Sequence, residues 1–119
     1  MTIHGRDVTF KKTVGAACAI EKLSETAGGV QAYLNSKTYS EQQEHCAAFM
    51  EELSKGAEEA LFWEAYNRGE QYQVKPLTSS EALTLENAEF NALFVEAVVA
   101  WQGDAPEIKA KAEKKADAQ

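Results

Sequence analysis

The chain has 119 residues and a formal charge of −7, from 12 basic and 19 acidic side chains. This length predicts one compact domain with a single core. The sequence contains no run of about 18 apolar residues, so we expect no membrane-spanning helix. The acidic balance argues against a protein that binds duplex DNA directly, because phosphate contacts need clustered lysine and arginine. The first six residues lack the apolar stretch of a signal peptide, so we expect an intracellular protein with reduced, buried thiols at Cys18 and Cys46.

The N-terminal residues have the pattern of a β-hairpin. Thr2-Ile3 and the run from Asp7 to Lys12 flank His4-Gly5-Arg6, where glycine can supply the positive φ of a tight turn. In that hairpin one apolar face is shared by Ile3, Val8 and Phe10.

Helix signals follow directly. Thr13 is placed to cap a helix from Val14 to about Glu25, which Gly28-Gly29 would end. A short helical turn is expected from Val30 to Leu34.

The clearest helix begins at Ser40, which forms the pattern of a capping box with Gln43. Gly69 supplies its stop. Its apolar face at the helical period comprises Cys46, Phe49, Met50, Leu53, Ala57, Ala60 and Leu61. Its charged face comprises Glu51, Glu52, Lys55, Glu58 and Glu59, which we expect to be solvated.

A second capping box, Thr78 with Glu81, predicts a helix or broken helix from Ser80 to Trp101, closed by Gly103 and Pro106. The residues beyond are mostly Ala, Lys and acidic residues and cannot bury a face. We therefore predict an α+β fold that is mainly α-helical, with an N-terminal β-hairpin and a disordered or frayed C-terminal tail. Residues 1–103 would form the single compact domain and residues 104–119 the flexible charged tail.

Residue patterns that support catalysis are nearly absent. The sequence has no glycine-rich phosphate loop, no CxxC and no HExxH. His45 and Cys46 are adjacent on a helix and point about 100° apart, so they cannot chelate one metal from the same face. We expect a solvent-facing histidine and a core cysteine, with a Cys–His nucleophile pair as the alternative. The prediction is a non-enzyme with no catalytic residues, no metal site and no cofactor.

An aromatic cluster interrupts the charged face of the long helix. Phe62 projects about 160° from Cys46, and Trp63 and Tyr66 lie near it. In one interpretation the helix bends or ends near Leu61 and the rings rejoin the core. In the other they form an exposed patch that docks a partner, since Trp and Tyr dominate binding hot spots.

The last helix carries two apolar stripes. The first, at core spacing, comprises Phe90, Leu93, Phe94, Ala97, Val98 and Trp101. The second, nearly opposite, comprises Ala88, Ala92, Val95 and Val99. A helix that is apolar nearly all round is buried on both sides. We therefore predict a central helix, or one that packs on a helical partner or on a second copy in a homo-oligomer.

Several short motifs, taken in order, carry a family resemblance. Residues 3–11 read I-H-G-R-D-V-T-F-K, and a helix then opens with Thr13-Val14-Gly15-Ala16 and continues to Glu21-Lys22-Leu23. Pro76-Leu77-Thr78 opens the later part, and an apolar final helix from Asn87 to Trp101 precedes a Lys/Ala/Glu tail. This layout resembles the tail assembly chaperones of long-tailed bacteriophages.

The resemblance implies a small, acidic, mostly helical chaperone of the host cytoplasm that is absent from the finished virion. Such proteins coat the tape measure protein, keep its long apolar helices soluble and recruit tail tube subunits. Many are made in two lengths by a programmed ribosomal frameshift near the end of the gene. The codons of Lys114-Lys115 would be a candidate site, and those of Lys11-Lys12 could form the same slippery sequence. The competing interpretation is an acidic regulatory or inhibitory protein that mimics nucleic acid. Its binding surface would be the seven carboxylates of residues 41–64. This range contains one lysine, Lys55.

Overall fold

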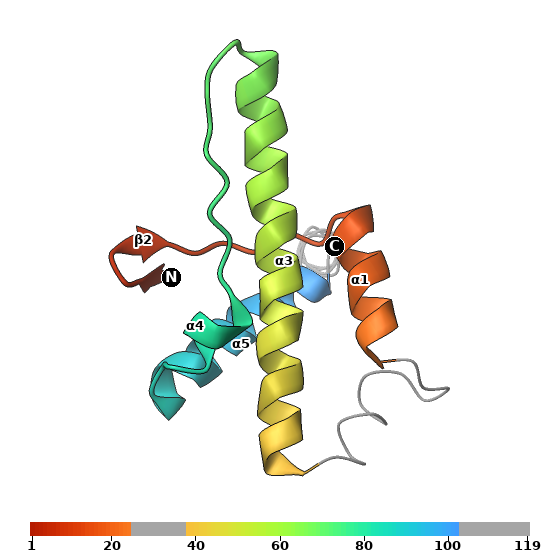
Figure 1. Cartoon of the computed structure of the whole chain (residues 1–119), viewed down its shortest axis with the longest axis vertical. Helices are drawn as coiled ribbons and strands as arrows, with labels where there is room; N and C mark the ends of the chain where they lie inside the picture. The colour runs from red at the N-terminus through yellow and green to blue at the C-terminus, as the bar shows by residue number, and fades with distance from the viewer. Residues whose placement is uncertain (25–37, 103–119) are drawn as a thin grey trace, which may run out of the picture.

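The long helix α3 (Tyr39–Asn67) is the axis against which the other helices pack (Figure 1). The computed structural model describes residues 1–24 and 38–102, and these form a mainly helical α+β fold with an N-terminal β-hairpin. The remaining elements are β1 (Thr2–Ile3), β2 (Arg6–Asp7), α1 (Val14–Ser24), α4 (Ser79–Ala82) and α5 (Asn87–Trp101). None of the helices described is long and apolar enough to cross a bilayer.

The predicted hairpin is present but shorter than expected. Its two strands are antiparallel, and His4 (φ 49°) and Gly5 (φ 79°) form the turn. Two consecutive positive φ angles are the signature of a two-residue hairpin turn, which favours glycine at the second position. The chain then leaves the sheet, because the Lys11 backbone N–H donates to the Leu53 carbonyl of α3 at 3.0 Å. The expected strand from Asp7 to Lys12 is therefore wrong beyond its first residue.

The cap predicted for α1 is confirmed. The Thr13 hydroxyl accepts a hydrogen bond from the Ala16 backbone N–H at 3.1 Å. The expected stop at Gly28-Gly29 and the helical turn from Val30 to Leu34 lie outside the described residues.

The start of α3 differs from the prediction by two residues. Thr38 is the N-cap: its hydroxyl accepts from the Glu41 N–H at 3.3 Å, and the Glu41 carboxylate accepts from the Thr38 N–H at 3.3 Å. This reciprocal pair is a capping box with the same spacing as the one expected at Ser40 and Gln43. The sequence pattern occurs twice here, and the helix uses the first.

The helix stop predicted at Gly69 is confirmed: α3 ends at Asn67, and Gly69 has a φ of 72°. The Glu70 N–H donates to the Ala65 carbonyl at 2.8 Å and the Gly69 N–H to the Tyr66 carbonyl at 3.0 Å. This is a Schellman motif, in which glycine takes the left-handed conformation. The helix therefore continues well past Leu61, and the interpretation in which it bends or ends there is wrong.

The last predicted helix is broken into α4 and α5. The Thr78 hydroxyl accepts from the Glu81 N–H at 3.1 Å, as expected of a cap, and α4 ends at Ala82. The Glu81 carboxylate does not complete a capping box, because it is engaged by the hairpin. The expected stops at Gly103 and Pro106 and the tail of residues 104–119 lie outside the described residues.

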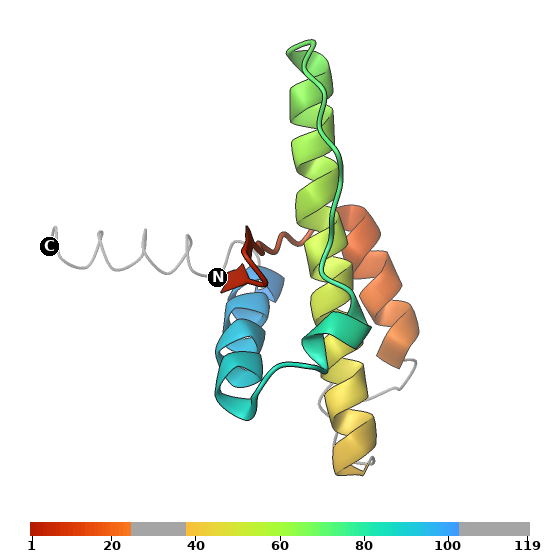
Figure 2. The ribbon, with the colours of Figure 1, turned by 60° about the vertical axis from the view of Figure 1, so that its left-hand side comes forward.

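The core lies where the hairpin, α1, α4 and α5 meet α3. The predicted apolar faces of α3 and α5 both contribute, with Phe49 against the rings of Phe94 and Trp101 at centroid distances of 5.8 and 5.6 Å. The prediction is wrong at Leu61, which is 38 % exposed because the end of α3 extends beyond the helices that cover its middle. The fully buried large side chains are Ile3, Ile20, Met50, Leu53, Leu77 and Leu93. The end of α3 that precedes Gly69 stands clear of α1, α4 and α5, and residues 70–78 return alongside it (Figures 1 and 2).

Candidate interaction surface

The aromatic cluster, Phe62, Trp63 and Tyr66, is exposed on the C-terminal end of α3, the clear end that none of the other described helices covers. The exposed fractions of these residues are 36, 57 and 64 %. The ring of Trp63 stands edge-on to Phe62 at 5.2 Å and to Tyr66 at 5.4 Å between centroids. Three large rings that contact one another outside the core form a contiguous apolar surface, which marks a candidate binding site, whereas single exposed apolar side chains are common.

A groove adjoins the aromatic cluster. It has a volume of about 430 Å³ and lies between the end of α3 and the returning segment. Its lining residues are Phe62, Tyr66, Glu70, Gln71, Tyr72 and Gln73. Sequence patterns gave no sign of this groove, because its two walls are separated by the turn at Gly69.

One wall of the groove is held by Glu58. Its carboxylate accepts from the Tyr72 hydroxyl at 2.9 Å and from the Lys75 backbone N–H at 2.9 Å, and Glu58 is only 9 % exposed. Burial, together with this carboxylate, raises the pKa of Tyr72. The expectation that the glutamates of α3 are all solvated is therefore wrong at Glu58, because the returning segment covers that face.

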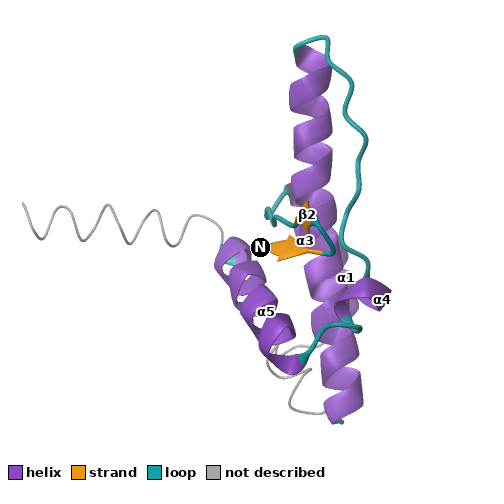
Figure 3. Ribbon diagram, turned by 90° about the vertical axis from the view of Figure 1, so that its left-hand side faces the viewer, coloured by secondary structure: helices purple, strands orange, loops and turns teal. Residues whose placement is uncertain are grey.

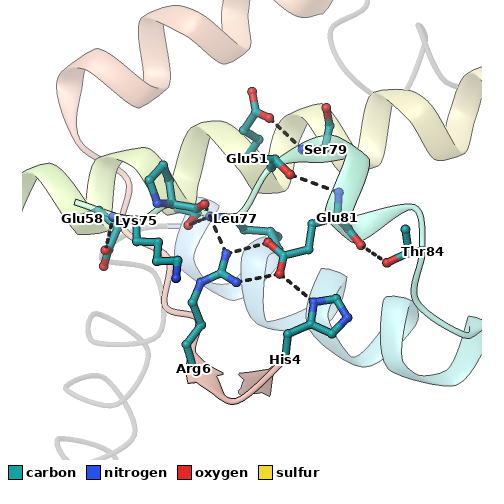
Figure 4. Close-up of polar contacts among 12 residues, drawn as sticks. His4, Arg6, Glu51, Glu58, Lys75, Leu77, Ser79, Glu81 and Thr84 are labelled. Atoms are coloured by element: carbon teal, nitrogen blue, oxygen red, sulfur yellow. Dashed lines mark hydrogen bonds and ion pairs between the residues drawn. The ribbon is translucent and has the colours of Figure 1, made fainter. Parts of the chain in front are cut away.

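Two further α3 side chains fix the returning segment (Figure 4). The buried Ser54 hydroxyl accepts from the Leu77 N–H at 2.8 Å, and the Glu51 carboxylate from the Ser79 N–H at 2.7 Å. These acceptors satisfy the Leu77 N–H of the returning segment and the Ser79 N–H at the first residue of α4, which has no partner within that helix, and such donors would be costly to bury unpaired. The segment that forms the groove wall is therefore anchored along much of its length.

The hairpin is clamped to α4 by Glu81 (Figure 4). The Arg6 guanidinium donates to both carboxylate oxygens of Glu81 at 2.6 Å, and His4 Nδ1 lies 2.7 Å from the same group. The Arg6 hydrogen bonds, with a smaller effect from His4, lower the pKa of Glu81 to about 2. On the other side the Met1 ammonium lies 3.4 Å from Glu96 of α5, so the hairpin bridges α4 and α5 (Figure 3).

The histidine and cysteine predictions are partly wrong. His45 is buried rather than solvent-facing, and burial lowers its pKa. Cys46 is buried as expected, and burial raises the pKa of its thiol, which is the opposite of an activated nucleophile. Cys18 is exposed on α1, contrary to the expectation of a buried thiol. Among residues 1–24 and 38–102, no three histidine, cysteine or acidic side chains group as metal ligands.

The second stripe of α5 is exposed as well. Ala88 and Ala92 are exposed, and Val95 and Val99 are 60 and 47 % exposed. A central helix buried on both sides is therefore wrong for the described residues. The stripe and the aromatic cluster do not form one surface, because α5 packs beside the middle of α3 and the cluster lies at its end (Figures 1 and 2).

The carboxylates expected for a nucleic-acid mimic are partly engaged within the fold. Glu51 and Glu58 hold the returning segment, and Glu52 lies 3.3 Å from the Lys55 ammonium. Fewer carboxylates of α3 therefore remain to form an acidic binding surface.

Comparisons with family models, with curated proteins and with solved structures gave no match to this chain.

Proposed function

We propose that this protein is a non-enzymatic tail assembly chaperone of a long-tailed phage. In this role it binds the tape measure protein in the host cytoplasm and helps to recruit tail tube subunits. The motifs between Ile3 and Leu23 and the apolar final helix supply the resemblance. The observation that carries the proposal is the exposed aromatic cluster on the clear end of α3.

The physical requirements of such a chaperone support this choice. A protein that keeps a long apolar chain soluble needs apolar surface for its client and net charge to oppose aggregation of the complex. The aromatic cluster and the stripe of α5 supply the first, and the charge of −7 supplies the second. Two separate apolar surfaces would also let one protein contact a client and a second subunit.

The proposal predicts that the gene immediately downstream encodes a long helical tape measure protein, and it is tested by co-expression with that protein. The expected result is that this protein is soluble with the wild-type chain and insoluble with a Phe62→Ser/Trp63→Ser variant. Because both rings are exposed, the variant should remain folded, which circular dichroism would check. Equal solubility of the downstream protein with wild type, with the variant and without either would contradict the proposal.

A further inference from the structure

The exposed aromatic cluster has a carboxylate aligned with it. At 100° per residue, Glu59 and the three rings of Phe62, Trp63 and Tyr66 share an arc of about 100° on α3. Glu59 is exposed and lies one turn before Phe62 and Trp63. At the other end of the cluster, Glu70 lines the groove together with two glutamine side chains.

The charge around the cluster is negative. Between residues 58 and 74 the sequence has four carboxylates and one cation, Arg68. Arg68 lies 3.2 Å from Glu70, with both side chains more than half exposed, so this ion pair is weak and readily exchanged. Within the part of the chain that the structure describes, no lysine or arginine forms an ion pair with Glu59 or Glu64.

Aromatic faces and carboxylates together favour a cation. The face of an aromatic ring carries negative potential, and a cation within about 6 Å of its centroid is attracted, most strongly by tryptophan. The chain already makes one such contact, in which the Lys12 ammonium lies 4.3 Å from the Trp101 ring centroid. At the exposed cluster the rings, unlike Trp101, have no cation from the described residues over them.

We propose that the aromatic cluster binds an arginine side chain from a basic segment of the partner protein. A planar guanidinium stacks on ring faces and donates several hydrogen bonds in its plane, which Glu59, one turn before Phe62 and Trp63, can accept. Arginine matches this site better than a purely apolar side chain, because it can pair with Glu59, which has no lysine or arginine partner among the described residues. The inference rests on the proposed function, since the client supplies the arginine, and it adds the chemistry that the client must present.

The test compares two synthetic helical peptides of leucine and alanine that differ only in carrying arginine or its neutral isostere citrulline. Isothermal titration calorimetry of the full chain at low salt should give about 10-fold tighter binding of the arginine peptide. In Trp63→Leu, which keeps an apolar side chain but removes the ring, this preference should fall to about 2-fold. The citrulline peptide should bind the two proteins nearly equally.

Glu59→Gln and Glu89→Gln form a matched pair, because each removes one exposed carboxylate and only Glu59 adjoins the cluster. The first should reduce the arginine preference about 3-fold and the second should leave it unchanged. The inference is overturned if neither peptide binds, if both bind equally, or if the preference survives Trp63→Leu. It is also overturned if the two glutamine variants behave alike. Capture of the downstream protein by the wild-type chain without any arginine preference would overturn this inference and leave the proposed function standing.

Discussion

Replacing Gly56 by alanine tests the close approach between α3 and the segment that leads into α1. A Cβ atom at this position would lie 2.6 Å from the Lys11 carbonyl oxygen, 3.0 Å from the Thr13 hydroxyl and 3.3 Å from the Ala16 Cβ. Helix propensity alone favours alanine over glycine by about 1 kcal/mol in a helix interior. The contact with the Lys11 backbone opposes this gain, because backbone cannot move aside as the end of a flexible side chain can.

We expect the contact to prevail. Overpacking a closely packed position costs about 1–3 kcal/mol, and here the displaced segment also carries the Lys11 hydrogen bond to Leu53 and the Thr13 cap of α1. Gly56→Ala should therefore lower the free energy of unfolding by about 1–2 kcal/mol net of the propensity gain. Urea denaturation followed by circular dichroism measures this difference.

Gly15→Ala is the matched control, because Gly15 is also helical and nothing lies within 4 Å of a Cβ built on it. This variant should be as stable as wild type or more stable, by up to about 1 kcal/mol. If Gly56→Ala is also stabilised, the close crossing of residues 11–16 over α3 is not as described and the reasoning is refuted.

Other predictions concern single contacts, all measured by urea denaturation. Glu81→Gln should cost about 2 kcal/mol at neutral pH, because the ion pair with Arg6 is lost. The pKa of Glu81 is lowered from 4.5 to about 2, so the stability that the pair supplies is present above pH 4.5 and lost as the pH falls toward 2. The free energies of unfolding of the wild type and of Glu81→Gln should therefore converge as the pH approaches 2. A constant difference between pH 4.5 and 2 would contradict the assignment of the lowered pKa to the Arg6–Glu81 pair. Val95→Glu should leave stability within about 0.5 kcal/mol of wild type, because this valine is exposed, whereas a large loss would show that it is buried. Tyr72→Phe should cost about 1–2 kcal/mol by removing a donor from the buried Glu58, and a neutral result would show that this bond does not anchor the returning segment.

The features predicted correctly from the sequence depend on neighbouring residues. The Thr13 cap and the stop at Gly69 are set by hydrogen bonds within one helical turn. The buried faces of α3, apart from Leu61, and of the first stripe of α5 follow from the helical period. The aromatic cluster was placed on the correct face for the same reason, and its exposure follows because α3 continues to Asn67.

The features that were missed depend on residues far apart in the chain. Glu58 belongs to the charged face of α3, as predicted, but a helical period cannot show that residues 70–78 return to cover that face. Arg6 and Glu81 are 75 positions apart, and nothing local marks them as partners. Gly56 likewise has no local signature, because the segment that excludes a side chain there comes from another part of the fold.

The most direct test of the proposed function is the affinity of Trp63→Ala for the long helical protein encoded downstream, measured together with its stability. We predict that binding weakens by about 2 kcal/mol or more, which is roughly 30-fold, while the free energy of unfolding stays within about 0.5 kcal/mol of wild type. Unchanged affinity for the downstream protein would contradict the proposal that the aromatic cluster is the client-binding surface. A loss of about 3–5 kcal/mol in stability would contradict it too, since that result is expected of a ring in the core.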